Sequence, residues 1–396
     1  MKFNWFKVRA DIIPLFAFFM IALLPTSFRG QMNELPFLIV VWMLSGLFIV
    51  CVILQNAINI TAFKAALFIV LYMVVVTTAQ LFANVYARVS LARIVPLAFL
   101  LLMLSIDVKY YSNLSMIKKI IDLFSVLTLF WNAGILLQIN PVIEFTKDFY
   151  SQYQEKALYY SLLYRKPVLT FGVHNYASFF YFLFFYFCYC LASKTKQKRY
   201  YLFCLMYIVY TFLLTSNSSI IYAILMLCMF VYLIRKKIYL IIGAAVTALI
   251  IFWSNFQLLY VNYSIFLADK KSGFRGRYFS DNNIYIENFK LIKSSFGIGF
   301  CILDNVDLNY RDSGYIVYAT MGNVILVIAL YGLLLFWIKR NISKRHRFVL
   351  AFIVLSFELA SVASFQYRYI YMLVFVMYFF SALDKSISKN IELDGS

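Results

Sequence analysis

Apolar residues run along most of this chain in long stretches, and polar residues gather in the segments between them. Each stretch has roughly the 17–25 residues that a helix needs to cross a bilayer. The pattern predicts an all-α polytopic integral membrane protein with about 12 transmembrane helices, in a single membrane domain over residues 1–396. The stretches lie at about 12–28, 37–54, 63–83, 89–106, 118–139, 170–192, 200–215, 219–234, 238–254, 313–338, 348–364 and 367–383.

Two parts of this pattern have a second interpretation. The stretches at 200–215 and 219–234 are short and only residues 215–218 separate them, so one re-entrant pair is an alternative to two spans. The first stretch follows a basic start, as in a signal peptide, but it lacks a small-residue cleavage site. We therefore expect it to be the first span.

Basic residues in the short loops predict which loops face the cytoplasm, because Lys and Arg concentrate in cytoplasmic loops. Three basic runs, at 194–199, 235–237 and 339–347, fall on one side when the spans alternate. Loops 25–36 and 215–218, on the other side, carry at most one basic residue each. The distribution predicts a multi-pass protein with both termini in the cytoplasm.

Two outward-facing segments, 140–166 and 255–312, are too long to be simple connections. In the first, aromatic residues recur at near-helical spacing from Phe145 to Tyr164, which predicts an interfacial helix. Most of the remaining basic residues lie in these two loops. Long translocated loops are largely exempt from the topology bias, so we expect their cations to serve another purpose.

The composition excludes several classes of protein. With 64% hydrophobic and 13% charged residues, the chain lies outside the range of soluble proteins, in which about 25% of residues are charged. Its net charge of +19 sits in short runs between apolar stretches, so we expect no nucleic-acid partner. The sequence has no GKS or GKT loop, no HExxH, no GxSxG and no CxxC, so we expect neither a metal nor a cofactor.

The loop 255–312 contains a candidate anion site. Arg275 and Arg277 stand just ahead of a predicted amphipathic helix at 285–296, which glycines at 297 and 299 end. Guanidinium groups and the free N–H groups of a helix start both favour phosphate oxygens, so a diphosphate fits there. In the alternative interpretation, these arginines hold lipid headgroups or pair with nearby aspartates.

A second candidate set lies where the loop 140–166 leads into the next span. Arg165 and His174 come at the outer mouth of that span. An imidazole there can hydrogen-bond a sugar hydroxyl or a phosphate, or accept a proton. The alternative is a boundary histidine whose hydrogen bonds are satisfied within the protein.

A third set enters the membrane after the loop 255–312. Arg311, Asp312 and Tyr315 combine a cation, a carboxylate and a phenol, which can orient a polar acceptor or act as a helix cap with a headgroup anchor. Glu358 and Arg368 fall at the late spans, where a carboxylate is costly and often functional. Pairing of Glu358 with a neighbouring helix is the alternative.

Taken in order, these segments resemble the Wzy-type O-antigen and capsular polysaccharide polymerases and their relatives, the O-antigen ligases. The likeness covers roughly residues 160–335. It consists of Gly172, His174 and Asn175 opening a span; TSNSS (215–219) starting another; Gly276 and Arg277 ahead of an amphipathic helix and a GIGF turn (297–300); and Asp-Ser-Gly-Tyr (312–315) entering a span that contains Gly322.

The resemblance implies a metal-independent glycosyltransferase with a GT-C-like membrane fold in the bacterial inner membrane. It would join undecaprenyl-diphosphate-linked oligosaccharide repeat units into O-antigen or capsule at the periplasmic face, by en bloc transfer of the growing chain. A chain-length regulator is an expected partner, besides membrane lipid.

The resemblance also assigns roles to residues. Periplasmic arginines bind the diphosphate in these families, and Arg165, Arg277 and Arg275 match them here. Arg311 and Tyr315 join the substrate-binding set, and Arg311 begins an Arg-x10-Gly spacing that ends at Gly322, as in some family members. The catalytic candidates are His174 and Asp312, either of which would activate the acceptor hydroxyl.

Two other functions remain open. An O-antigen ligase shares most of these features, but the ligases' periplasmic His before the late span is replaced here by Asp312 or Tyr315. A flippase for lipid-linked oligosaccharides would carry cations inside its spans and short outer loops, whereas this chain confines most charge to loops. Both differences favour the polymerase.

Overall fold

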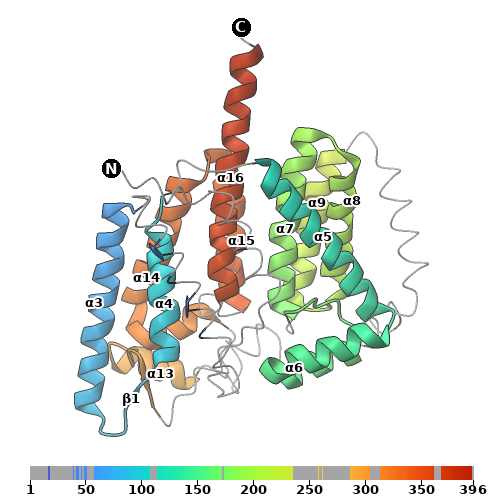
Figure 1. Ribbon diagram of the computed structural model, residues 1–396. Coiled ribbons are helices and arrows are strands. Elements are labelled where there is room, and N and C mark those ends of the chain that lie inside the picture. Colours follow the sequence, from blue (N-terminus) through green and yellow to red (C-terminus); the bar gives the residue numbers. More distant parts are fainter. Residues whose placement is uncertain are drawn as a thin grey trace, which may run out of the picture. The chain divides into compact units, whose positions relative to one another are not determined.

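The structure is a computed structural model that describes residues 58–107, 114–171, 174–234, 286–303, 313–360 and 367–394, with isolated positions before residue 58 and at 257 and 261. The chain divides into two compact units (Figure 1). Unit 1 comprises Met1–Ile120 and Tyr285–Ser396, and unit 2 comprises Ile121–Ile284.

Unit 1 is built from helices that pack around α14, with one short strand pair. Its described elements are α3 (Ile60–Ala83), β1 (Arg88–Val89), α4 (Leu91–Leu104), α13 (Ile286–Ser294), β2 (Cys301–Ile302), α14 (Gly314–Asn341), α15 (Lys344–Ala360) and α16 (Tyr367–Asp394). Helix α14 packs against α3, α4, α13, α15 and α16. The start of α14 and the strand pair lie at the same end of the unit, here called the β1–β2 end.

Unit 2 is a smaller group of helices. Its described elements are α5 (Leu114–Leu136), most of which belongs to this unit, α6 (Asn140–Leu163), α7 (His174–Thr195), α8 (Lys198–Leu213) and α9 (Asn217–Ile234). Helices α7, α8 and α9 pack against one another. The predicted interfacial helix in 140–166 corresponds to α6.

The almost entirely helical structure is that expected of an α-helical membrane protein. Among the described helices, α3, α5, α7 and α14 are long and apolar enough to cross a membrane. Nine of the predicted stretches coincide with described helices, with bounds that differ by a few residues at most ends. The stretches at 12–28, 37–54 and 238–254 lie outside the described ranges, so the number of twelve spans stays a prediction.

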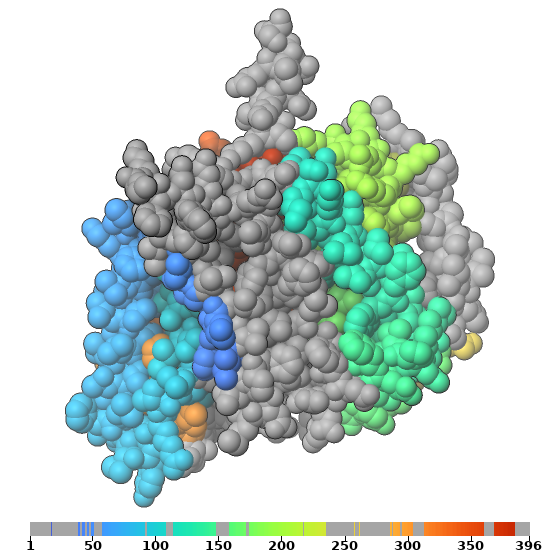
Figure 2. Space-filling model, viewed as in Figure 1, coloured from blue at the N-terminus to red at the C-terminus, as the bar shows by residue number. Residues whose placement is uncertain are grey.

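Helix α3 shows why these helices suit a membrane. One of its faces, with Ala62, Ala66, Ile69 and Met73, is buried in unit 1, whereas the opposite face leaves large apolar side chains such as Phe68 exposed. In Figure 2, α3 (blue) forms the surface along one edge of the view. An exposed face this apolar is stable against lipid and not against water.

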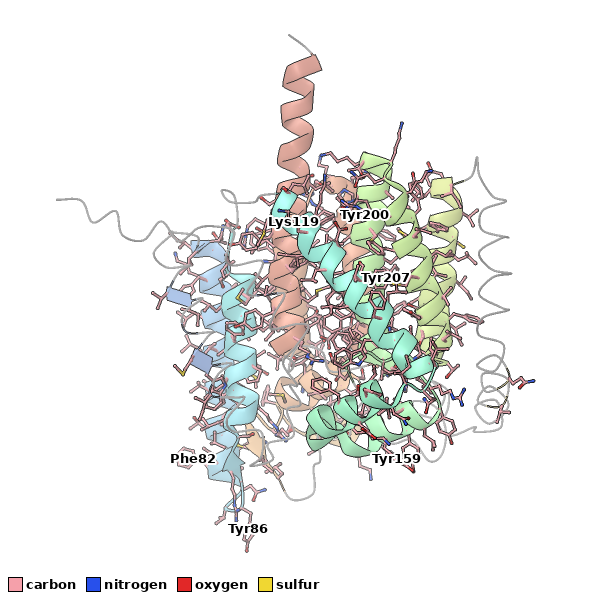
Figure 3. The ribbon with its side chains drawn as sticks, turned by 45° about the vertical axis from the view of Figure 1, so that its right-hand side comes forward. Phe82, Tyr86, Lys119, Tyr159, Tyr200 and Tyr207 are labelled. Atoms are coloured by element: carbon pink, nitrogen blue, oxygen red, sulfur yellow. The ribbon has the colours of Figure 1, made fainter. Side chains whose placement is uncertain are left out.

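Aromatic residues mark the β1–β2 end of α3. Phe82 and Tyr86, which are 87% and 77% exposed, lie at this tip of the unit (Figure 3). Aromatic rings of this kind gather where a bilayer meets water. The tip of α3 therefore has the character of a membrane boundary.

A polar clamp joins three elements at the opposite end of unit 1. Arg340 of α14 pairs with Asp107 and donates hydrogen bonds to the carbonyl oxygens of Leu104 (3.2 Å) and Ile106 (2.9 Å). Asn59, the N-cap of α3, donates to the same carboxylate at 2.8 Å. These contacts fix the start of α3, the end of α4 and the end of α14 to one another.

Unit 2 is packed mainly by aromatic rings. The rings of Phe124 and Phe184 stack with their centroids 3.9 Å apart, joining α5 to α7. Tyr207 of α8 is fully buried, points into the interior of the unit (Figure 3), and its hydroxyl lies 3.0 Å from the Ser125 hydroxyl. Aromatic side chains therefore fill this core, and the buried Tyr207 hydroxyl finds a partner within it.

Candidate functional site

Helix α14 is broken near its first third. Gly322 and Asn323 leave the helical conformation, with φ, ψ of −144°, 27° and 57°, −171°. The φ, ψ pair of Asn323 lies in a region that residues other than Gly rarely adopt, so the surrounding contacts must hold the backbone there. A Cβ atom at Gly322 would lie 2.6 Å from the Cβ of Leu326, so the backbone also needs Gly there for space. The break separates a short first segment, Gly314–Met321, from the rest of the helix.

The turn Gly297–Phe300 fills this break. Its backbone N–H groups at Ile298 and Gly299 donate to the carbonyl oxygens of Thr320 (3.0 Å) and Met321 (2.8 Å). The hydroxyl of Tyr72 on α3 donates to the carbonyl oxygen of Gly322 at 2.8 Å. Non-helical backbone is tolerated at membrane depth only where its polar groups are satisfied within the protein. These three bonds satisfy the carbonyl oxygens of Thr320, Met321 and Gly322.

Two glycines allow the turn to approach α14 and α3 so closely. Gly297 and Gly299 have φ of 112° and 59°. A Cβ at Gly297 would overlap the carbonyl oxygen of Met321, and one at Gly299 would lie 2.5 Å from the hydroxyl oxygen of Thr77. Conformation and space both require glycine at these two positions.

The amphipathic helix α13 is attached to the same break. The side-chain amide of Asn323 donates to the carbonyl oxygens of Ile292 (3.0 Å) and Ser295 (2.8 Å), at the end of α13. The amide of Asn288, within α13, donates to the hydroxyl of Thr320 at 3.0 Å. Side-chain amides therefore hold α13 against the first segment of α14 and against the break that follows it.

Helix α3 and the strand pair complete this module from the other side. Gln80 donates to the carbonyl oxygen of Gly297 at 2.8 Å, and the N–H of Phe300 donates to the hydroxyl of Thr77 at 3.0 Å. Arg88 pairs with Ile302 in the antiparallel β1–β2 ladder. The loop after the third predicted span and the loop 255–312, both predicted to face outward, thus contact each other.

The start of α14 rests on the last turns of α15. The hydroxyl of Ser313 lies 3.4 Å from the carbonyl oxygen of Glu358, to which it donates, and that of Tyr315 donates to the carbonyl oxygen of Leu355 at 2.9 Å. Tyr315, a predicted substrate-binding residue, is thus placed beside Glu358, with its ring centroid 4.6 Å from that of Tyr331. Its hydroxyl is engaged by the protein backbone.

In unit 2, the structure brings together two of the sequence segments that carry the resemblance. His174 is the first residue of α7, and the side-chain oxygen of Asn175 accepts a hydrogen bond from Ser218 at 3.0 Å. Ser216 in turn contacts the hydroxyls of Ser218 and Ser219. A polar cluster of His, Asn and Ser side chains therefore marks the His174 end of this unit.

The segment 164–171 approaches the start of α7 in an irregular conformation. Arg165 has a positive φ of 51° and is half-buried. Asn132 of α5 fixes the segment, because its side-chain oxygen accepts from the N–H of Leu169 at 2.9 Å and its amide donates to Tyr181 at 2.7 Å. The half-buried Lys166 is a cation that sequence reasoning missed, and burial lowers the pKa of its ammonium group.

Four of the predicted site residues, Arg275, Arg277, Arg311 and Asp312, lie outside the described residues. Of the other three, the structure places Arg165 and His174 in unit 2 and Tyr315 in unit 1. Glu358 and Arg368 are both buried in unit 1, at 1% and 3% exposure. No three His, Cys, Asp or Glu side chains lie close enough to hold a metal ion in the part of the chain that the structure describes.

Sequence reasoning also missed the polar residues that hold the break in α14. Tyr72, Gln80, Asn288 and Asn323 sit within or beside apolar stretches, where an amide is costly unless it finds a partner. A polar residue inside a predicted span was therefore the one sequence feature that could have pointed to a hydrogen-bond partner elsewhere in the chain. Tyr72, Gln80 and Asn323 donate to backbone carbonyls, and Asn288 donates to the Thr320 hydroxyl. All these partners lie far away in the sequence, so no local pattern identifies them.

Three comparisons with known proteins found no match. No protein-family model, no curated protein and no solved structure matches the chain. The functional interpretation therefore depends on the residue pattern and on the geometry of the two units.

Proposed function

We propose that this chain polymerises undecaprenyl-diphosphate-linked oligosaccharide repeat units into O-antigen or capsular polysaccharide at the periplasmic face of the bacterial inner membrane. The observation that supports this most is the module at the break in α14. There the amphipathic helix α13, the GIGF turn and the span containing Gly322 are joined by hydrogen bonds at 2.8–3.0 Å. These are the segments that carry the resemblance to polymerases in the second half of the chain.

The sidedness of the contacts supports the same proposal. The β1–β2 ladder joins two loops that the basic-residue pattern assigns to the periplasm. The clamp of Arg340, Asp107 and Asn59 joins segments that the same pattern assigns to the cytoplasm. In the proposed topology, the break in α14 and the polar end of α7 both belong to the periplasmic half of the membrane.

The chemistry would proceed as a glycosyl transfer. A hydroxyl oxygen of the incoming unit attacks the anomeric carbon of the growing chain, the bond from that carbon to the diphosphate oxygen breaks, and undecaprenyl diphosphate leaves with the negative charge. Arg275 and Arg277 would hold this diphosphate, because guanidinium groups stabilise charge that develops in the transition state. His174 or Asp312 would take the proton of the attacking hydroxyl.

Arg165 and Lys166 would extend the cationic surface near the start of α7. A half-buried cation attracts an anion more strongly than one in water, because its surroundings screen the charge less. Lowering of the Lys166 pKa by burial reflects the same poorly hydrated surroundings. In the proposal, these two residues contact the diphosphate or the lipid-linked acceptor.

The proposal is tested by the polysaccharide ladder of a host that lacks this chain. We expect the ladder to collapse to one repeat unit and to be restored by wild type and by Lys344→Ala, a variant of an exposed cation in the proposed cytoplasmic turn. Arg277→Lys at equal membrane abundance should fail to restore it, because the bidentate fork of Arg is lost.

Other outcomes identify the rival functions. Full-length polymer that stays on the lipid carrier in the deleted host would indicate a ligase. Full-length chains at normal abundance would overturn the polymerase proposal, and accumulation of repeat units on the cytoplasmic face would indicate a flippase. Normal restoration by Arg277→Lys would remove the arginine clamp from the mechanism.

A further inference from the structure

Three successive residues at the start of α14 rest on one surface, the end of α15. Ser313 and Tyr315 donate hydrogen bonds to the carbonyl oxygens of Glu358 and Leu355, at 3.4 Å and 2.9 Å. Gly314, between them, lies against the side-chain carboxyl group of Glu358. The place where the chain enters α14 is therefore determined by the last turns of α15.

The carboxyl group of Glu358 fits against Gly314 only because Gly314 has no side chain. A Cβ atom at position 314 would overlap the Oε2 atom of Glu358 and would lie 3.1 Å from the hydroxyl oxygen of Tyr331. Glu358 is only 1% exposed, so its carboxyl group cannot turn out into solvent. The carboxyl group thus occupies the space that the absent side chain of Gly314 leaves.

The surroundings leave the carboxyl group little room to move. The cavity beside it, lined by Tyr331, Glu358, Tyr369 and four leucines, measures about 10 Å³, which is about the space of one water molecule. The ring of Tyr331 is itself packed, with centroids 4.6 Å from Tyr315 and 6.1 Å from Tyr318. A displaced carboxyl group would therefore have to move the tyrosines or the start of α14.

A carboxyl group is a costly choice for a purely packing role at this place. An apolar side chain of similar volume would fill the space without the cost of burying a polar group. The start of α14 offers a compensation, because the free N–H groups of a helix start carry partial positive charge, which favours the partially negative oxygen of a carboxyl or an amide group. Glu358 is therefore suited to fix a helix start in place.

We propose that Glu358 is a positioning residue, whose carboxyl group on Gly314 sets the location of the start of α14 and so of the chain that enters it from the periplasmic loop. This inference rests on the proposed function, in which Asp312, just ahead of that start, is a candidate for the residue that takes the proton. Glu358 acts through Gly314 and Tyr315 and does not contact the reacting atoms.

A size-exchange cycle tests the contact. Gly314→Ala adds a methyl group, Glu358→Asp removes one methylene, and the double variant restores the fit. Gly332→Ala, in the same helix, is the matched control, because a Cβ there meets nothing within 4 Å. Each purified variant is measured for Tm, and for kcat and KM of polymerisation with a lipid-linked repeat unit.

We expect Gly314→Ala to lower kcat roughly 10- to 100-fold at a nearly unchanged KM, because misplacement by about 1 Å affects the transition state more than binding. Glu358→Asp alone should lower kcat less. The double variant should recover to within about threefold of wild type, which is coupling in a double-mutant cycle. Glu358→Gln keeps the shape and should retain activity, as should Gly332→Ala.

Several results would overturn the proposal. Wild-type kcat in Gly314→Ala, or losses that add in the double variant, would show that the contact does not position the site. Loss of activity in Glu358→Gln at an unchanged Tm would indicate a direct chemical role. If Gly314→Ala does not fold, the comparison of Glu358→Asp with Glu358→Gln decides, and equal kcat values would contradict the proposal.

Failure of the proposed function is separable from failure of this contact. If wild type forms no polymer, the polymerase proposal fails, and the positioning role fails with it. The Tm changes of the single and double variants would still show whether Gly314 and Glu358 interact. If the Tm changes of the two single variants do not add in the double variant, while every variant keeps wild-type kcat, Glu358 has only a packing role. If the changes in Tm add in the double variant, Gly314 and Glu358 do not interact.

Discussion

Two helices that begin at polar segments of the sequence, α7 and α14, are supported in different ways. α7 is continuous over His174–Thr195 and is buried along nearly its whole length among aromatic rings. α14 is interrupted at Gly322 and Asn323, and hydrogen bonds hold both ends of its first segment. Support in α7 is spread over many contacts, whereas support in α14 is concentrated in a few.

This difference has a consequence for tolerance to change. Dispersed apolar contacts each contribute little, so the loss of one is absorbed. A buried backbone group that loses its hydrogen-bond partner costs the full desolvation of that group. We therefore expect single substitutions at the break in α14 to have larger effects than comparable ones within α7.

The largest effect should come from Gly297→Ala. The new methyl group would overlap the carbonyl oxygen of Met321 in a backbone with φ of 112°, and we expect a loss of about 3 kcal/mol or more. The measurement is the amount of monodisperse protein after detergent extraction, against Gly332→Ala as control. Equal yields of the two variants would contradict the tight seating of the turn in α14.

The next effect tests unit 2, where polar contacts are few. Asn132→Leu removes the acceptor of the Leu169 N–H and the donor to the Tyr181 hydroxyl, which keeps its own bond to the carbonyl oxygen of Pro167. We expect about 1–3 kcal/mol of destabilisation. Thermal unfolding of the solubilised protein measures it. An unchanged Tm would show that the remaining contacts of segment 164–171, among them the bond from Tyr181 to Pro167, hold it without Asn132.

Asn323 offers a finer test of the break. Asn323→Ala loses both bonds to α13 at a backbone conformation that favours Gly, which should cost about 1–3 kcal/mol. Asn323→Gly keeps the backbone freedom and loses only the amide, so it should cost less. Ser178→Ala within α7 should stay within about 0.5 kcal/mol in the same thermal assay. If Ser178→Ala costs as much as Asn323→Ala, the contrast between the two helices is wrong.

The smallest effect concerns pH at the turn between α14 and α15. His346 lies in the first turn of α15, ahead of the apolar run from Phe348, and burial together with Arg345 lowers its pKa to about 4 from an ordinary value of 6.5. Since the unfolded chain binds this proton more readily, stability should fall as pH drops from about 6.5 to 4 and stay level above that window.

Thermal unfolding across this pH range measures the effect. His346→Gln should show a shallower fall in Tm than wild type, and Lys344→Gln, an exposed neighbour, should behave as wild type. A wild-type slope in His346→Gln would assign the acid sensitivity to other groups.

Much of the helical structure could be predicted from the sequence, because it depends on local apolar runs. The helix predicted at 285–296 is α13 (Ile286–Ser294), and the aromatic spacing in 140–166 is α6. The glycines predicted to end this helix come shortly after it: α13 ends at Ser294, and Gly297 and Gly299 form the following turn with positive φ. In each case the residues that determine the feature lie within the segment itself.

The break in α14 could not be predicted, because its cause lies elsewhere in the chain. The sequence around Gly322 and Asn323 is otherwise apolar and reads as one continuous span. The break is stable only because Tyr72 and the turn at 297–300 supply donors from more than twenty residues away. The placement of Glu358 against Gly314 likewise depends on how α15 packs, which a linear pattern does not contain.

The most direct test of the polymerase proposal is reconstitution of the purified chain in vesicles with an undecaprenyl-diphosphate-linked repeat unit, in buffer containing EDTA. We expect a ladder of chains longer than one unit, with undecaprenyl diphosphate released once for each linkage formed, and a much weaker ladder from Gly314→Ala than from Gly332→Ala. Repeat units that remain single in the presence of folded wild-type protein would contradict the proposal that this chain forms the linkage.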